Sequence, residues 1–222
     1  MAPSWLRAFA DVYVPLSILT AALVLADIVL LGRRQWMAIM DVVWPLTMLY
    51  WGPLGLPTYA WFGRAGAGQH ASEHDHRPMW QAVFLGATHC GAGCALGDFL
   101  GDWIAFFSGL SLFGSEFGGK LLLSFLLAYL FGIEFQYFSV APMRGLGLRD
   151  GLIAAVKIDT LSLVAYEVGM FAVMAAGMLV LPGLEPTSRA YWLTMQAAML
   201  AGFATTYPVN WALFRVGVKE AM

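Results

Sequence analysis

The stretch that decides the fold reads THCGAGCALGDFLGD and covers residues 88–102. It places strong metal-binding and proton-carrying side chains, including both cysteines of the protein, inside an otherwise apolar run. On a helix, a step of four residues turns by about 40° and rises by about 6 Å, so side chains at this spacing keep to one flank. Four reactive side chains have this spacing: Cys90, Cys94, Asp98 and Asp102. The stretch therefore predicts a helix with one reactive flank.

The composition around this stretch is that of a membrane protein. Of the 222 residues, 60% are hydrophobic and only 12% are charged, and the mean hydropathy is +0.70. A soluble domain of this size does not need so much apolar surface. The apolar runs are long enough to cross a bilayer, which takes about 20 helical residues. We therefore expect an all-α, polytopic integral membrane protein embedded in a lipid bilayer.

Six apolar runs predict six transmembrane helices in a single membrane domain over residues 1–222. The expected spans are residues 11–31, 38–62, 79–107, 120–140, 152–181 and 191–214. Pro45, Pro53 and Pro57 favour kinks in the second span. The third span is long and rich in glycine, so a break or a strong tilt is expected there. The first run is too long for the apolar core of a signal peptide and is expected to remain as a span.

The distribution of basic residues predicts the orientation. With six spans, both termini share one side, which collects Arg7, Arg64, Arg77, Arg144, Arg149, Arg215 and Lys219. The other side collects Arg33, Arg34, Lys120 and Arg189. Because loops rich in Lys and Arg stay in the cytoplasm, both termini are predicted to be cytoplasmic. The net charge of −2 gives no sign of a nucleic-acid partner.

Ionisable side chains inside the spans need partners, because an unpaired charge is costly in a bilayer. Asp27 and Asp41 are expected to pair with Arg33 or Arg34. Deeper in the spans, acids outnumber the one available cation, Lys157. This surplus of negative charge predicts an ion or proton path through Asp102, Glu134, Lys157, Asp159 and Glu167. The structural alternative is that the acids are protonated, hydrogen-bonded packing residues.

The ligand types in the third span predict a metal site. Thiolate and imidazole together favour copper(I) or zinc, so the expected ligands are His89, Cys90, Cys94 and Asp98. The Cys-x3-Cys spacing differs from that of a zinc ribbon, and buried cysteines often serve only as small apolar residues.

A histidine-rich loop precedes the third span. Residues 69–78 read QHASEHDHRP and contain His70, His74 and His76. These histidines are predicted to recruit a metal ion to the mouth of the site. The alternative is a solvated polar loop.

The motif at residues 88–98, together with the closing NWALFRVGVKEAM at residues 210–222, resembles the bacterial membrane family called domain of unknown function 4396. The resemblance covers residues 79–222. It implies a bacterial multi-helix protein, and hence the inner membrane. Its signature includes His89, Cys90, Cys94 and Asp98, but it implies no activity.

Three functions follow from these patterns. The favoured one is a protein that binds copper or zinc and transports the ion or hands it over. The second is a thiol–disulfide redox protein that uses Cys90 and Cys94. The third is an assembly subunit that joins a second copy or another membrane protein through a stripe of small residues, Gly93, Gly97 and Gly101. No known enzyme signature is present, so catalysis other than this redox chemistry is not expected.

Overall fold

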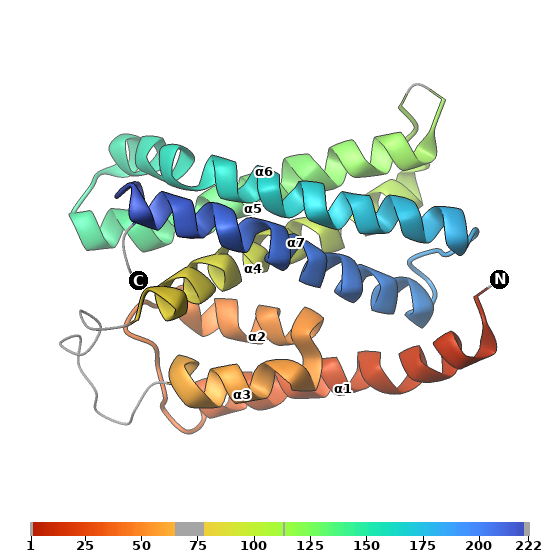
Figure 1. Cartoon of the computed structure of the whole chain (residues 1–222), viewed down its shortest axis with the longest axis horizontal. Coiled ribbons are helices and arrows are strands. Elements are labelled where there is room, and N and C mark those ends of the chain that lie inside the picture. Colours follow the sequence, from red (N-terminus) through yellow and green to blue (C-terminus); the bar gives the residue numbers. More distant parts are fainter. Residues whose placement is uncertain (1, 65–77, 113, 220–222) are drawn as a thin grey trace.

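The computed structural model describes residues 2–64, 78–112 and 114–219. Five long helices account for most of these residues and lie side by side along the long axis of the molecule (Figure 1). They are α1 (Ser4–Val29), α4 (Met79–Ser108), α5 (Glu116–Arg144), α6 (Leu148–Val180) and α7 (Arg189–Arg215). The predicted all-α class is confirmed.

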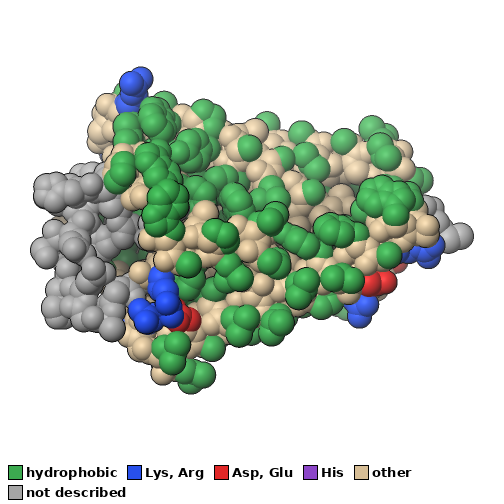
Figure 2. All heavy atoms as spheres, turned by 60° about the horizontal axis from the view of Figure 1, so that its bottom comes forward, with side chains coloured by type: hydrophobic (Ala, Val, Ile, Leu, Met, Phe, Trp, Pro, Cys, Tyr) green, Lys and Arg blue, Asp and Glu red, His purple; other side chains and the backbone are tan. Residues whose placement is uncertain are grey.

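Four of these helices are long and apolar enough to cross a membrane. They are α1, α4, α5 and α6, with mean hydropathies of 2.1, 1.3, 1.6 and 1.9 in their most apolar windows. Figure 2 shows the matching surface: apolar side chains cover the middle of the face in view, and the charged side chains lie toward its two ends. The predicted membrane protein is therefore supported, whereas six transmembrane helices are not confirmed.

The second predicted span is a helical hairpin instead of one helix. It comprises α2 (Met40–Trp51), a 3-10 turn (Gly52–Gly55), α3 (Leu56–Thr58) and a π-helical turn (Tyr59–Gly63). The α2 helix ends at Gly52, whose φ of +57° suits glycine and few other residues. Pro53 follows at once and starts the tighter turn.

The hairpin returns to the end of the bundle from which it started (Figure 1). The rings of Trp44 in α2 and Tyr59 in the returning limb lie 5.3 Å apart. Tyr59 and Arg64 both donate hydrogen bonds to Asp27, near the end of α1. Arg33 also lies 3.6 Å from Asp27, and Arg34 lies 3.1 Å from Asp41, so the predicted pairing of these two acids is confirmed.

This hairpin changes the relation between the two ends of the chain. The prediction that both termini share one side depends on six separate spanning helices, and the hairpin stands in place of the second one. In Figure 1, α1 starts at one end of the bundle and α7 finishes at the other. The start of α7 meets α1 through an ion pair of 3.0 Å between Arg189 and Asp11.

The helix α4 is continuous, so the predicted break in the third span is wrong. Its 30 residues end at Gly109, which adopts a left-handed conformation with φ of +62°. The next helix, α5, begins at Ser115, whose hydroxyl accepts a hydrogen bond from the backbone N–H of Gly118. These two signals produce a short connection, which makes α4 and α5 antiparallel neighbours.

Candidate functional site

The helix α4 lies at the centre of the bundle. In its most apolar window 72% of the residues are buried, compared with 28% in α1 and 33% in both α5 and α6. Small residues permit this position, because a Cβ atom at Gly93, Gly97 or Gly101 would collide with the backbone of α5. The reactive flank of α4 consequently faces protein instead of lipid.

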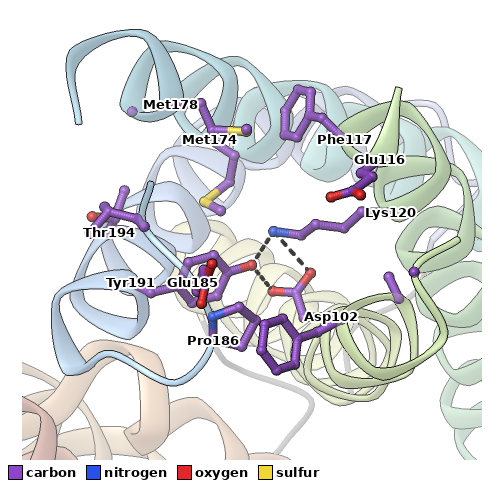
Figure 3. A pocket seen from close by; sticks show the side chains of 15 residues that line it. Asp102, Glu116, Phe117, Lys120, Met174, Met178, Glu185, Pro186, Tyr191 and Thr194 are labelled. Atoms are coloured by element: carbon purple, nitrogen blue, oxygen red, sulfur yellow. Dashed lines mark hydrogen bonds and ion pairs between the residues drawn. The ribbon is translucent and has the colours of Figure 1, made fainter. Parts of the chain in front are cut away.

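At one end of the bundle, Asp102 of α4 belongs to a buried polar cluster with α5 and α7 (Figure 3). The Lys120 ammonium lies 3.2 Å from the Asp102 carboxylate and donates a hydrogen bond to the Tyr191 hydroxyl, which in turn donates to Asp102. Ser124 donates a further hydrogen bond of 3.3 Å to Asp102. Asp102 is thus neutralised by a cation and held by three side chains.

A cavity of about 260 Å³ reaches this cluster from the helix ends. Glu116, which lies near Lys120, and Glu185, which lies near Tyr191, also line it (Figure 3). The cavity extends from the polar end of the bundle to the Lys120 side of this ion pair, and the Asp102 side chain remains buried behind it.

A second buried ion pair lies toward the opposite end of the bundle. The ammonium of Lys219 lies 2.5 Å from the Asp159 carboxylate of α6, and the two side chains are 1% and 0% exposed. Lys219 also donates a hydrogen bond of 2.6 Å to the Asn210 carbonyl oxygen, which accepts another from Ser162 at 2.9 Å. From its place near the end of the sequence, Lys219 was predicted only to be a loop charge, so this role was not predicted.

Between the two ion pairs lie two carboxyl groups without a partner. Asp98 of α4 and Glu167 of α6 are 1% and 2% exposed. None of their four carboxyl oxygens has a hydrogen-bond partner in the described part of the chain. Asp98 is close enough to Glu167 and Asp102 for their charges to interact, and Glu167 lies against the Cys94 thiol. These two acids are the carboxyl groups of the bundle core for which neither oxygen has a hydrogen-bond partner among the described residues.

Other polar groups continue this line toward the second ion pair. The hydroxyl groups of Tyr50 in α2 and Tyr166 in α6 both lie against Gly91 of α4. His89 is fully buried within the electrostatic reach of Asp159 and Lys219. Together, the polar side chains that follow α4 from one ion pair to the other form what we term the buried polar line: His89, Tyr50, Tyr166, Cys94, Glu167, Asp98 and Asp102.

The structure brings together only part of the predicted path. Asp102, Asp159 and Glu167 are buried, whereas Glu134 and Lys157 are exposed on the outside of the bundle. The prediction that Lys157 supplies the buried cation is wrong, because Lys120 and Lys219 make those ion pairs. Both lysines stand at the edges of apolar runs, where the sequence alone does not distinguish a buried side chain from a loop charge.

The predicted metal site is also wrong. In the described residues, no group of three or more His, Cys, Asp and Glu side chains is arranged to hold a metal ion. The reason is geometric: from His89 to Asp98 a regular helix rises about 13 Å, whereas metal–ligand bonds measure about 2.0–2.3 Å. One ion cannot meet these four ligands on a straight helix, and no other described helix supplies the missing ones. The predicted recruiting residues His70, His74 and His76 lie outside the described residues.

Neither alternative function is favoured by the structure. Cys90 and Cys94 are both free thiols with no exposed surface, and they sit on successive turns of a regular helix. The glycine stripe that a partner helix would need is already covered by α5 of the same chain. Buried thiols and a filled packing surface give no support to a redox protein or an assembly subunit.

A comparison with protein families finds one family that covers the residues of this site. Residues 79–219 match the family described as domain of unknown function (DUF4396). The chain belongs to this family. The match begins with α4 and ends at Lys219, so both buried ion pairs and the acids between them lie inside the DUF4396 domain. No curated protein and no solved structure matches the chain.

Proposed function

We propose that this DUF4396 protein transfers protons across a membrane along the buried polar line. The observation that carries the proposal is the pair Asp98 and Glu167, two buried carboxyl groups whose oxygens have no hydrogen-bond partner in the part of the chain that the structure describes. An ionised carboxylate in such a place costs several kcal/mol unless a cation pairs with it. The nearby Lys120 is already engaged by Asp102. Each of the two acids is therefore expected to rest in its protonated form and to release the proton only to a neighbouring acceptor.

The spacing of the line suits stepwise transfer. Asp98 and Asp102 are one turn apart on α4, which corresponds to about 6 Å along the helix axis. Glu167 reaches the same region from α6 and lies beside Cys94. A side-chain rotation or one bridging water spans such gaps. The cavity beside Asp102 provides an entrance at one end, and Lys219 lines a smaller opening with Arg144 at the other.

We further propose that α1 and α4–α7 cross the membrane, and that the α2–α3 hairpin enters and leaves on one side. The basic residues then divide unevenly. The end at which α7 finishes carries Arg33, Arg34, Arg64, Arg144, Arg149, Arg215 and Lys219, whereas the other end carries Arg7, Lys120 and Arg189. This bias favours a cytoplasmic C-terminal end and an N-terminus on the opposite side. A bacterial inner membrane fits this orientation.

Proton flux into liposomes tests the proposal. The purified chain is reconstituted with a pH-sensitive dye inside, and a potassium gradient with valinomycin drives protons inward. Wild-type vesicles should acidify faster than protein-free vesicles. Asp98→Asn and Glu167→Gln keep the shape of each side chain but remove the exchangeable proton, so either change should reduce the flux to the protein-free rate.

Glu134→Gln is the matched control, because the same chemical change is made on the exposed face of α5. This variant should keep the wild-type flux. Elution as a single species and an unchanged melting temperature in detergent confirm that each variant is folded. Wild-type flux equal to that of empty vesicles, or full flux in the folded double variant of Asp98 and Glu167, overturns the proposal.

A further inference from the structure

A second, apolar cavity reaches the buried polar line from the side of the bundle. Its volume is about 380 Å³, and it lies between α1, α2, α4 and α7. This size falls in the range of about 300–1,000 Å³ that is usual for small-molecule sites. Ile18, Leu49 and Phe99 line the cavity and are also exposed on the outer surface of the bundle. The cavity therefore opens toward the face that lipid would cover.

Two residues that line this apolar cavity carry a hydrogen-bond acceptor that is itself buried and has no partner in the described structure. One is the Asp98 carboxyl group, which has no hydrogen-bond partner among the described residues. The other is the side-chain oxygen of Gln196 in α7. The amide nitrogen of Gln196 donates to the backbone oxygen of Leu49 at 2.6 Å, whereas the oxygen is buried without a partner in the described structure. An apolar pocket with a few polar groups of one kind is typical of a ligand site.

The two acceptors lie at the same depth in the bundle. Asp102 of α4 and Tyr191 of α7 are joined by a hydrogen bond, which fixes the register of these antiparallel helices. Asp98 lies four residues before Asp102, and Gln196 lies five residues after Tyr191, so both are about 6–8 Å from that contact in the same direction. Asp98 and Gln196 therefore line the cavity at about the same level of the bundle.

The walls of the cavity suit an aromatic or aliphatic body. The rings of Phe99 and Trp192 line it with their centroids 5.3 Å apart, and Met195 and Met199 line it from α7. Asp98 is the only ionisable carboxyl or amino side chain among the described residues that line the cavity. A ligand that complements this cavity therefore has one positively charged group at one end of an apolar molecule.

From this arrangement we propose that the cavity binds a lipophilic primary amine, with its ammonium group against Asp98 and Gln196. The amine enters from the lipid face in its neutral form. The proton of the Asp98 carboxyl group moves to the amine nitrogen, which creates an ammonium–carboxylate pair without bringing a net charge into the bundle. When the amine comes from water as an ammonium ion, one proton is released to the buffer instead. The proposal rests on the proposed function only in using the same exchangeable proton on Asp98.

Equilibrium dialysis of the detergent-purified full chain tests this site, with naphthylmethylamine as the probe and ethylnaphthalene as its neutral counterpart. The expected result is saturable amine binding that weakens at least tenfold in Asp98→Asn, because the ion pair is lost while the amide keeps the shape. At a pH where the probe is an ammonium ion, a pH indicator should record the release of one proton for each amine bound by the wild type. Glu134→Gln is the control and should bind like the wild type.

A variant that fills the cavity provides an independent check. Ala95 lines the cavity, and Ala95→Phe should abolish binding of both probes without changing the charge. Equal amine binding by the wild type and Asp98→Asn, or amine binding that survives Ala95→Phe in a folded protein, overturns the proposed site. Amine binding that depends on Asp98 in a protein without proton flux would refute the proposed function and leave this site standing.

Discussion

Removal of the Lys219 charge is expected to be among the most damaging single changes in this protein. The Lys219 ammonium lies 2.5 Å from Asp159, and both side chains are almost completely buried. Replacement of Lys219 by Met keeps much of the apolar stem but leaves the Asp159 carboxylate in the core without its cation. Asn210 keeps its hydrogen bond from Ser162, so the loss is confined mainly to the ion pair.

The size of the effect follows from the geometry. At 2.5 Å, and with an effective dielectric constant of about 20, the Coulomb attraction is about 7 kcal/mol. The cost of removing both groups from water offsets much of this attraction. Removal of one partner from a buried pair therefore costs about 3–5 kcal/mol, whereas replacement of both by apolar residues is close to neutral. We expect Lys219→Met to lower the free energy of unfolding by about 4 kcal/mol.

Unfolding by sodium dodecyl sulfate in mixed micelles, followed by circular dichroism, measures this free energy. The double variant Lys219→Met with Asp159→Leu should recover most of the loss. Lys157→Met is the matched control, because Lys157 is exposed only two residues from Asp159 on the same helix. The reasoning is refuted if Lys219→Met is as stable as the control, or if the double variant is no more stable than the single one.

Three further predictions concern packing, topology and the thiols. Gly97→Ala should lower the free energy of unfolding by about 2 kcal/mol because its Cβ meets the backbone of α5. In contrast, Gly147→Ala, which has open space around it, should change stability by less than about 0.5 kcal/mol. In intact cells, an impermeant maleimide should label Glu185→Cys but not Arg149→Cys; the reverse pattern refutes the proposed orientation. Both native thiols should resist maleimide in the folded protein and react after unfolding, and rapid labelling of the folded chain contradicts their burial.

The sequence predicted the features that depend on neighbours along the chain. The length of the third apolar run predicted the bounds of α4 to within one residue. The predicted span covers residues 79–107, and the observed helix is Met79–Ser108. The pairing of Asp27 and Asp41 with the arginines of the next loop was also predicted, because these residues are close in sequence. Asp102 and Glu167 were predicted to need a proton, a cation, water or a partner from another helix, because neither has a basic residue within a helical turn.

The second predicted span is where hydropathy failed to predict the fold. Its hydropathy fits a crossing, and Pro45, Pro53 and Pro57 indicated kinks, but hydropathy does not record the direction of the chain. The reversal depends on the positive φ of Gly52 and on the contact between Tyr59 and the end of α1. The pattern of apolar and polar residues along the chain does not predict contacts between residues so far apart in sequence.

The amino-acid sequence by itself determined that this chain forms apolar helices with a reactive flank on α4, since both follow from helical periodicity. Only the tertiary structure decided which groups meet. It paired Lys120 and Lys219, from distant parts of the chain, with Asp102 and Asp159, and it left Asp98 unpaired beside an apolar cavity. The physical reason is that a helix spreads its own side chains along an axis. Groups can converge on a point only from neighbouring helices, whose identity, direction and register are set by the packing of the whole bundle.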